Sequence, residues 1–326
     1  MKKNLLAVTV NEAYVEQAKA LFSSVYFNAG WRGDYMLLSG AIPEDKLKWF
    51  RDKGILIYKC DAISTSLIGF KKLCPQTLCK FYLFKPEFKK WDNIVYLDVD
   101  IIVRAPIDEL TKIKGFAAVY DVGESSLYSQ FLRTGDLSKN QKMLYEKLRK
   151  EFDLRKKTFN AGVMAFNTNI IRDDTFLKLK SFFSLYSPIH YNGDQPTFNL
   201  FFYKKWQRLA RVYNVYATKA GKEPGFSDMK GIILHIMGKE ENKPWSHGNY
   251  YYNEWKNNLE KAENIDILRP VVSIKPWPKI KIWAYSTFIY LSMAYYSVDK
   301  TIGRAGLFIK KKYPSLYGNL KKIKDR

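Results

Sequence analysis

Two aspartates interrupt an otherwise apolar run near the middle of the chain. Residues 94–103 read Ile-Val-Tyr-Leu-Asp-Val-Asp-Ile-Ile-Val, with the acidic side chains at Asp98 and Asp100. In a β-strand, residues i and i+2 point to the same side, so the two carboxylates would share one face. Two anions beside a core are costly unless a cation or strong donors compensate them. A divalent cation is the economical solution, because carboxylate oxygens suit magnesium or manganese. The alternative is a strand that ends at Leu97 and leaves two aspartates in a surface loop.

A histidine and several basic residues form a second candidate cluster. His235 follows the apolar run 231–234, so it also lies where a strand is expected to end. An imidazole ligand would shift the metal preference from magnesium towards manganese, although a purely structural histidine is the alternative. Gly238 allows close backbone approach to an oxyanion, and Lys239 or Lys243 would supply a compact positive charge for a diphosphate. An exposed basic loop is the other interpretation of these residues.

Short apolar runs that alternate with stretches of helical period must position these groups. Strands are expected at Leu5–Val10, Tyr35–Ser39, Ile55–Tyr58, Ile94–Leu97, Gly115–Tyr120, Gly162–Phe166 and Ile232–Leu234. Helices are expected at Ala13–Phe27, Pro43–Lys53, Leu78–Phe84 and Ile171–Tyr186, and a helical or irregular insertion at Gly123–Thr158. This alternation predicts an α/β fold with a mainly parallel central sheet and helices on both faces. Such sheets bind ligands at the carboxyl ends of their strands.

Composition restricts the class of protein. The 326 residues are 47% apolar and 26% charged, which excludes wholesale disorder. A formal charge of +22 predicts polyanionic partners, such as phosphate groups, nucleic acid or an anionic membrane. Cys60, Cys74 and Cys79 form no Cys-x-x-Cys pair, so we expect neither a disulfide framework nor a cysteine zinc site, and a reducing compartment fits best. The apolar run 5–10 is too short for a signal-peptide core, which favours a cytoplasmic protein.

The excess of positive charge is concentrated at the end of the chain. Residues 270–326 contain twelve Lys and Arg against two Asp, and three prolines mark their start. We therefore expect a catalytic domain at 1–269 and a C-terminal helical extension at 270–326. Residues 282–298 carry no charge but include many aromatic and hydroxyl side chains, a pattern that favours the membrane interface. A membrane span and a packed helix with a solvated basic end are the alternatives.

The aspartate pair and five further segments, which follow one another in the same order as in the family, resemble the family 8 retaining glycosyltransferases. These are the relatives of glycogenin and of bacterial lipooligosaccharide galactosyltransferases, and Asp98-Val99-Asp100 resembles their metal motif. The other matching segments are Thr9–Tyr14, Thr77–Lys80, Phe159–Val163, Gly193–Pro196, and His235–Gly238 through Lys243-Pro244-Trp245. The resemblance covers roughly residues 4 to 250. It implies a single Rossmann-like, nucleotide-binding domain of the GT-A type.

The resemblance also implies a reaction and a set of site residues. The reaction is transfer of a hexose from a UDP-sugar with retained anomeric configuration, and Asp98, Asp100 and His235 would hold one Mn²⁺ or Mg²⁺. The implied nucleotide-sugar site comprises Val8, Thr9, Asn11, Tyr14, Lys80, Asp98, Val99, Asp100, Asn160, Ala161, Asp194, Gln195, His235, Gly238 and Lys243. Asp194 and Gln195 form the implied catalytic pair. Helix packing by Tyr14 and an N-cap role for Asp194 are the alternatives.

Two departures from the family pattern affect the details. Residues 239–242 resemble a small insertion, so either Lys239 or Lys243 could bind the diphosphate, and Lys243 is preferred because it keeps its Pro-Trp neighbours. Pro196 replaces an aspartate that some relatives have after the glutamine, which removes one candidate nucleophile. We therefore expect front-face departure and attack, with Gln195 or a nearby carbonyl stabilising the cationic sugar.

The basic, aromatic C-terminus resembles that of bacterial family members that act on lipid-linked acceptors. It implies a glycan or glycolipid acceptor, such as a lipopolysaccharide core, and a peripheral location at the inner face of the membrane through residues 270–326. A basic nucleic-acid-binding protein is one alternative, but no RNA- or DNA-binding motif is present, so no nucleic acid partner is expected. A sugar nucleotidyltransferase is the other, although residues 8–14 lack the glycines of its N-terminal loop.

Overall fold

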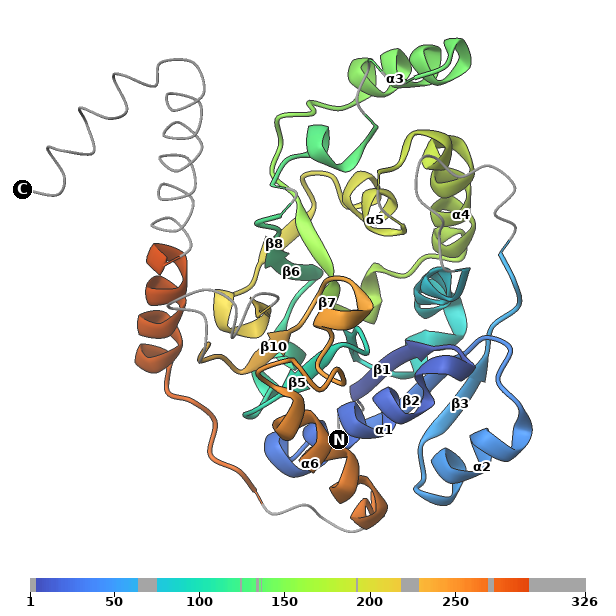
Figure 1. The fold of residues 1–326 in the computed structure, drawn as a ribbon. Helices are drawn as coiled ribbons and strands as arrows, with labels where there is room; N and C mark the ends of the chain where they lie inside the picture. Colours follow the sequence, from blue (N-terminus) through green and yellow to red (C-terminus); the bar gives the residue numbers. More distant parts are fainter. Residues whose placement is uncertain are drawn as a thin grey trace, which may run out of the picture.

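A seven-stranded sheet runs through the middle of the computed structural model (Figure 1). The structure describes residues 4–63, 75–123, 125–132, 135, 137–191, 193–217, 229–268 and 273–292. The strands are β1 Asn4–Val10, β2 Asp34–Ser39, β3 Leu56–Lys59, β4 Asn93–Leu97, β6 Phe116–Tyr120, β7 Phe159–Asn167 and β8 Trp206–Arg208. Their order is β3-β2-β1-β4-β7-β6-β8, and only β7 runs antiparallel to its neighbours. The predicted mainly parallel α/β sheet is confirmed.

A second, smaller sheet lies beside the carboxyl ends of these strands. It comprises β5 Ile101–Val103, β10 Ile233–His235 and β9 Val215–Tyr216, with β10 in the centre. β10 is antiparallel to β5 and parallel to β9. This sheet joins a segment that directly follows β4 to one that lies some 130 residues further along the chain. It is therefore the device that brings the two candidate clusters of the sequence together.

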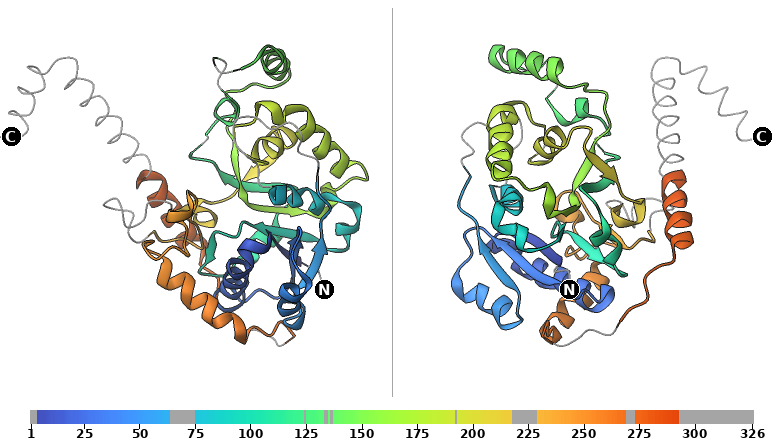
Figure 2. Two further views of the ribbon diagram at one scale, coloured as in Figure 1. Left: turned by 45° about the vertical axis from the view of Figure 1, so that its right-hand side comes forward. Right: turned by 180° about the vertical axis from the view of Figure 1, so that it is seen from behind.

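Helices cover both faces of the large sheet, as a parallel sheet buried on both sides requires. The α-helices are α1 Val15–Ser24, α2 Glu44–Asp52, α3 Lys139–Glu151, α4 Thr175–Tyr186, α5 Gln195–Phe201 and α6 Tyr252–Lys261. Along β1, Leu6 and Val8 pack into the core beneath α1, α2 and α6, whereas Leu5 and Ala7 pack into the core beneath α4 and α5. Figure 2 shows these two layers on opposite sides of the strands.

Several elements differ from their predicted form. The segment expected as a helix at 78–84 is a 3-10 helix over Pro75–Phe84, and helix α4 begins only at Thr175 after the 3-10 turn Thr168–Ile170. The helix expected at 13–27 begins as the 3-10 turn Glu12–Tyr14 and ends as the π-helical segment Val25–Ala29. Gly30 terminates it in the left-handed conformation, with φ of 63°, where glycine carries no side-chain penalty. Propensity and period identify helical segments but not their hydrogen-bond pattern.

A C-terminal helix over residues 279–292 packs against the rest of the structure. Ile289 is buried in the core beneath α1, and Ile282 and Tyr285 pack on the same core. Within the described residues, no helix is long and apolar enough to cross a membrane. Part of the uncharged segment predicted at 282–298, and the basic residues beyond it, lie outside the described residues.

His190 provides a test of the packing beside the large sheet. The ring is 2% exposed, packs edge-on against Phe131 and Phe183, and contacts the Gly193 carbonyl oxygen through Nδ1 at 3.2 Å. Burial disfavours the imidazolium and lowers the pKa of His190 to about 3. The hydrogen bond to Gly193 raises the pKa but offsets only part of this decrease. The folded protein therefore keeps this ring neutral where an unfolded chain protonates it.

We expect His190 to lower the free energy of unfolding as the pH falls from about 6.5 to about 3, by up to about 1.4 kcal/mol per pH unit. Because the folded pKa is depressed, this contribution to stability is complete above the unfolded pKa and is lost on acidification. Urea unfolding of the wild type and His190→Gln across this range would show a shallower acid slope in the variant. His247→Gln, at an exposed histidine, is the matched control and should retain the wild-type slope.

Candidate active site

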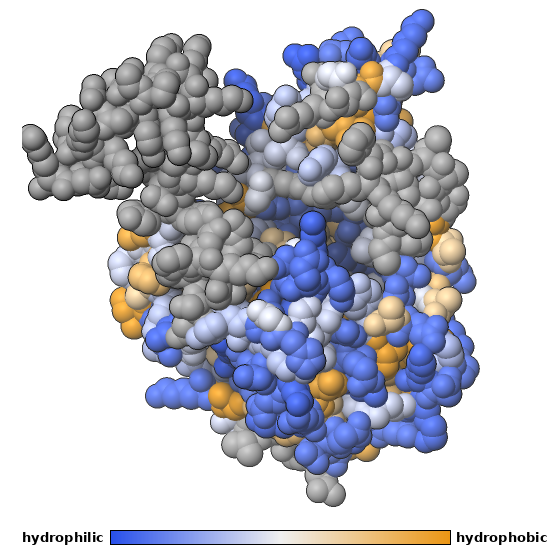
Figure 3. Space-filling view, in the orientation of Figure 1, coloured by the Kyte–Doolittle hydropathy of each residue, from blue (hydrophilic) through white to orange (hydrophobic). Residues whose placement is uncertain are grey.

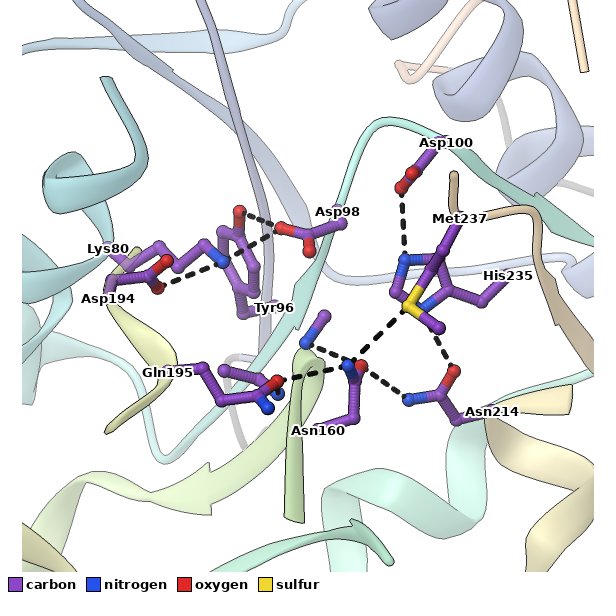
Figure 4. A network of polar contacts seen from close by, with 12 residues as sticks. Lys80, Tyr96, Asp98, Asp100, Asn160, Asp194, Gln195, Asn214, His235 and Met237 are labelled. Atoms are coloured by element: carbon purple, nitrogen blue, oxygen red, sulfur yellow. Dashed lines mark hydrogen bonds and ion pairs between the residues drawn. The ribbon is translucent and has the colours of Figure 1, made fainter. Parts of the chain in front are cut away.

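Three potential metal ligands converge where the two sheets meet. Asp98 and Asp100 lie in the turn between β4 and β5, and His235 is the last residue of β10. One ligand atom from each lies within 4.8 Å of the others, and His235 Nε2 is 3.1 Å from Asp100 Oδ1 (Figure 4). The Ile236 amide donates to the Asp100 carbonyl oxygen at 2.9 Å, which fixes the end of β10 against the aspartate turn.

The aspartates converge for a different reason than the predicted one. The apolar run 94–103 is not one strand, because β4 ends at Leu97 and β5 begins at Ile101 in the other sheet. The alternation argument was therefore wrong, whereas the alternative was right that the strand ends at Leu97 but wrong that both aspartates lie at the surface. Asp100 is 7% exposed and Asp98 only half-buried, and both face the end of β10 from within a turn.

Asp98 is oriented by a tyrosine and a buried lysine. Its Oδ1 accepts a hydrogen bond from the Tyr96 hydroxyl at 2.7 Å and lies 2.9 Å from Lys80 Nζ. Burial and the adjacent Asp98 raise the pKa of Tyr96, so its hydroxyl stays protonated and donates. Asp98 Oδ2 instead lies over Gly162, next to the His235 ring. One carboxylate oxygen is thus held by the protein, and the other faces the remaining two candidate ligands.

Lys80 connects Asp98 to the start of helix α5. The ammonium group is 3% exposed and also lies 3.1 Å from Asp194 Oδ2. Burial opposes its charge, but the attraction of Asp194 and Asp98 outweighs this effect and raises the pKa of Lys80. For Asp194, burial is the dominant effect and raises the pKa of the carboxyl, and the attraction of Lys80 offsets this increase only in part. Asp194 occupies the N-cap position of α5, but its side chain makes no capping hydrogen bond.

A chain of amide side chains fixes the orientation of His235 (Figure 4). The Gly162 backbone N–H donates to Asn160 Oδ1 at 2.9 Å, so that atom must be the oxygen of the amide. Asn214 Nδ2 donates to the same oxygen at 2.9 Å, which turns Asn214 Oδ1 towards His235 Nδ1 at 3.0 Å. The Nδ1 proton is therefore donated to Asn214, which leaves Nε2, beside Asp100, as the ring nitrogen that would ligate an ion when it carries no proton.

Gly162 is required by the close approach of these groups. A Cβ atom at this position would lie 2.3 Å from His235 Cε1 and 2.8 Å from Asp98 Oδ2. Both neighbours are held by hydrogen bonds, so neither can move aside cheaply. The register of β4 and β7 places Gly162 here, because the Asp98 amide donates to the Gly162 carbonyl oxygen at 2.8 Å.

Lys243 is the basic residue that reaches the aspartate turn. Its Nζ pairs with Asp100 Oδ2, whereas Lys239 is exposed at the start of a 3-10 turn. Burial of Asp100 disfavours its charge, but His235 and Lys243 outweigh this and lower the pKa of the carboxyl well below its usual range. The Asp100 carboxylate is therefore ionised at neutral pH. Gly238, between His235 and this lysine, has φ of 130°, a backbone conformation that favours glycine.

A cavity of about 280 Å³ opens beside the aspartate turn, at the small end of ligand-binding pockets. It is lined by Lys80, Asp98, Asp121, Gly123, Asn160, Ala161, Gly162, Gly193, Asp194, Gln195 and Met237. Gln195 Oε1 accepts from the Ala161 amide and from Asn160 Nδ2, both at 3.0 Å. Gln195 Nε2 donates to Asp121 Oδ2 at 2.7 Å. The cavity therefore offers polar groups of both signs around a space suited to one small polar ligand.

Most of the remaining predicted residues lie at or just after the carboxyl end of β1, the strand next to β4. Val8 and Thr9 are near the end of β1, where Val8 pairs with Leu97. Asn11 caps the following 3-10 turn by accepting from the Ala13 amide at 3.1 Å. The Tyr14 ring, at the end of this 3-10 turn, packs edge-on against Trp245 at 5.7 Å between centroids, and Trp245 lies in a turn and not in a helix. Val99 is half-buried against the core beneath α1.

Comparison with known proteins assigns this arrangement to a family. A model described as Glycosyl transferase family 8 matches residues 5–281. The chain belongs to this family. The predicted resemblance is confirmed.

Two curated relatives come from Streptococcus pneumoniae serotype 4. Glycosyltransferase GlyB is 27% identical over 198 residues, which are 60% of this chain and 37% of GlyB. Glycosyltransferase GlyA is 23% identical over 258 residues, which are 75% of this chain and 32% of GlyA. The family 8 chain thus spans about a third of the length of these relatives.

Solved structures confirm the GT-A fold. The bifunctional glycosyltransferase WbbM in its apo form has a TM-score of 0.60 at 18% identity, covering 81% of this chain and 51% of WbbM. An active-site mutant of LgtC has a TM-score of 0.59 at 15% identity, covering 87% of this chain and 99% of LgtC. Galactosyltransferase LgtC in complex with donor and acceptor sugar analogues has a TM-score of 0.55 at 16% identity over the same shares.

Sequence reasoning missed three residues of the site. Asp121 follows β6 and lines the cavity, where it also accepts from the Tyr216 hydroxyl at 3.1 Å. Asn214 precedes β9 and orients His235, and Met237 lies two residues beyond that histidine. Asp121 could have been found, because it is an acidic residue at the carboxyl end of a predicted strand. Asn214 carries no such signal, since its role depends on the amide opposite it.

We expect Gly162→Ala to displace His235 or Asp98 and so weaken binding of a divalent ion. Mn²⁺ should raise the unfolding midpoint of the wild type, since ligands that bind the folded state stabilise it. The variant should lose most of that rise, with an affinity about 10- to 100-fold lower. Gly248→Ala is the control, because a Cβ at Gly248 meets nothing within 4 Å. Equal Mn²⁺ shifts in both variants would show that the close approach at Gly162 does not shape the site.

Proposed function

We propose that the protein is a metal-dependent, retaining hexosyltransferase that uses a UDP-sugar donor. The observation that carries this proposal is the convergence of Asp98, Asp100 and His235 from two sheets onto one point. No simple structural role requires two carboxylates and an imidazole to meet at the carboxyl edge of a nucleotide-binding sheet. Membership of Glycosyl transferase family 8 supports a role for these three residues in glycosyl transfer.

The donor set fits a hard divalent cation. It offers two carboxylates and one imidazole, a combination that suits Mn²⁺ and also Mg²⁺. Four carboxylates, those of Asp98, Asp100, Asp121 and Asp194, stand against the ammonium groups of Lys80 and Lys243, which leaves a formal charge of −2. A bound divalent ion would balance this charge and act as a Lewis acid towards the departing diphosphate.

The nucleotide would lie across the aspartate turn from the cavity. We place the uridine near Val8, Thr9, Asn11 and Tyr14, at the carboxyl end of β1. Lys243 pairs with Asp100 and is long enough to follow a diphosphate bound beside it, with Gly238 giving the backbone close access. These groups would stabilise the negative charge that the leaving diphosphate gains.

The transferred sugar would occupy the cavity. Lys80, Asn160, Ala161, Asp194 and Gln195 line it and would position the hydroxyl groups, which lowers the entropic cost of reaching the transition state. Both hydrogen-bonding directions of Gln195 Oε1 are already used by Ala161 and Asn160. In the front-face route that we favour, Asp121 and Asp194 would therefore contribute the negative charge that stabilises a cationic sugar.

The acceptor would be a glycan or glycolipid presented at a membrane. Helix 279–292 packs through one side and exposes apolar side chains on the other, with Ile280, Phe288 and Leu291 each at least 60% exposed. These residues recur at helical spacing, and Figure 3 shows hydrophobic side chains gathered on this side of the molecule. Apolar side chains flanked by lysines suit the boundary between headgroups and acyl chains, and would hold the protein at the inner face of the membrane.

The metal-dependent step can be tested with a panel of UDP-sugars, Mn²⁺ and a UDP-release assay. One donor should be hydrolysed slowly without acceptor, and EDTA should abolish the reaction until Mn²⁺ is restored. Asp100→Asn should lower the rate at least about 100-fold, because losing a ligand removes several kcal/mol of charge stabilisation. The control Asp108→Asn removes an exposed aspartate in the 3-10 turn after β5 and should leave the rate unchanged. Full activity in EDTA would contradict the proposal.

Membrane attachment is tested by flotation with vesicles that contain phosphatidylglycerol. The full-length double variant Phe288→Glu/Leu291→Glu should lose most of its recovery in the lipid fraction, because it places two negative charges on the apolar side of helix 279–292. Met143→Glu alters another exposed apolar residue, on α3, and should float like the wild type. Undiminished flotation of the double variant would remove this helix from the membrane contact.

A further inference from the structure

A second, basic cleft of about 560 Å³ lies between helix 279–292 and the edge of the large sheet. Tyr120, at the end of β6, and Leu209 and Ala210, after β8, contribute one wall. Side chains of helix 279–292 form the opposite wall, and the Val212 amide lies 3.5 Å from Ser286 Oγ. Helix 279–292 is therefore part of a built cleft and not only an appendage.

The floor of this basic cleft contains a buried guanidinium. Arg211 is 4% exposed, and its Nη1 donates to the Tyr120 carbonyl oxygen at 2.7 Å. Its Nε is buried and has no hydrogen-bond partner among the described residues. Burial disfavours the charge and lowers the pKa of Arg211. Asp121 attracts Arg211 but does not outweigh the effect of burial, so an anion in the cleft would stabilise the guanidinium further.

Two further cations stand at the rim beside the same tyrosine. Lys157 Nζ lies 4.9 Å and Arg208 Cζ 5.5 Å from the centre of the Tyr120 ring. Among the described residues, no aspartate or glutamate lines the basic cleft, and Asp121 attracts Arg211 without lining the cleft. Three positive charges around one tyrosine repel one another. Their arrangement fits an anion with several oxygens, for which arginine and lysine are the usual partners.

The basic cleft adjoins the cavity proposed for the transferred sugar. Tyr120 lines the cleft, and the next residue, Asp121, lines the cavity. The two Cα atoms are about 3.8 Å apart, so the two spaces share a wall one residue thick. A molecule that presents a hydroxyl group to the cavity would reach the basic cleft with a neighbouring part of the same molecule.

We propose that the basic cleft binds a phosphate group carried by the acceptor. Lys157, Arg208 and Arg211 would hold the phosphate, and the exposed rings of Trp283 and Tyr290 at the rim would pack against the adjoining sugar. This assignment to the acceptor rests on the proposed function, whereas binding of a sugar phosphate in the cleft does not. The acceptor would then be an anionic, phosphorylated glycan.

The test uses the full chain and three soluble probes at constant ionic strength, namely glucose 6-phosphate, inorganic phosphate and glucose. Calorimetry should show binding of glucose 6-phosphate that weakens at least about 10-fold in Lys157→Gln/Arg208→Gln, because charge-assisted hydrogen bonds are lost. Lys147→Gln/Arg172→Gln makes the same change of charge at exposed sites elsewhere and should bind as the wild type does. Trp283→Ala should weaken binding of glucose 6-phosphate but not of inorganic phosphate.

Several outcomes would overturn the proposal. One is no binding of glucose 6-phosphate by the wild type, and another is equal loss in the cleft variant and the control. Equal affinity for inorganic phosphate and glucose 6-phosphate, with no effect of Trp283→Ala, would assign the cleft to free phosphate. Binding to phosphatidylglycerol vesicles that is lost in the cleft variant, without binding of glucose 6-phosphate, would assign it to a lipid headgroup.

The outcome can be separated from that of the proposed function. UDP release from the donor without acceptor should stay within about twofold of wild type in the cleft variants, since no cleft residue lines the sugar cavity. If glucose 6-phosphate binds in the basic cleft as expected but no UDP-sugar is turned over, only the proposed function is contradicted. Normal UDP release without cleft binding would contradict only the assignment of the basic cleft.

Discussion

The concentration of negative charge at one edge of the sheet is the constraint on which the rest of the site depends. Asp98, Asp100, Asp121 and Asp194 approach one another in a largely buried region, where unpaired carboxylates are costly. The protein offsets part of this cost with two lysines, of which Lys80 lies between Asp98 and Asp194 and Lys243 pairs with Asp100. The remaining oxygens face inward, toward His235 and the cavity. The fold thus maintains a net negative charge in this region, which favours binding of a cation.

Much of this arrangement is visible in the sequence because chemistry follows strand ends. Asp98 and Asp100 follow the apolar run that forms β4, and His235 ends the apolar run that forms β10. The smaller sheet, in which β10 pairs with β5, brings these two strand ends together. The structure brings the two predicted aspartates close to His235 although the strand argument for them failed, because β4 ends one residue before Asp98. Any geometry that keeps both carboxylates near the end of β10 serves the same purpose. A pattern of residue types can therefore predict a site without predicting the local backbone.

Features that depend on distant partners could not be predicted. The role of Asn214 exists only because Asn160 faces it from β7, and nothing in the residues around either asparagine indicates the other. The 3-10 character of the segment that carries Lys80 depends on packing against β1, β2 and α4. The docking of helix 279–292 depends on Ile289, whose apolar neighbours in sequence equally suit a lipid surface. Local periodicity does not distinguish burial against protein from burial in a membrane.

The orientation of His235 has a consequence for how the site responds to acid. Metal-binding histidines often donate a hydrogen bond to a carboxylate, which can itself be protonated and then no longer accepts that hydrogen bond in the same way. Here the neighbour is Asn214, and behind it stand a second amide and a backbone N–H, none of which titrates. The support of the imidazole is thus electrically neutral and indifferent to acidity. It adds no fifth anion to a crowded region, and it leaves Nε2 as the ring nitrogen that faces Asp100.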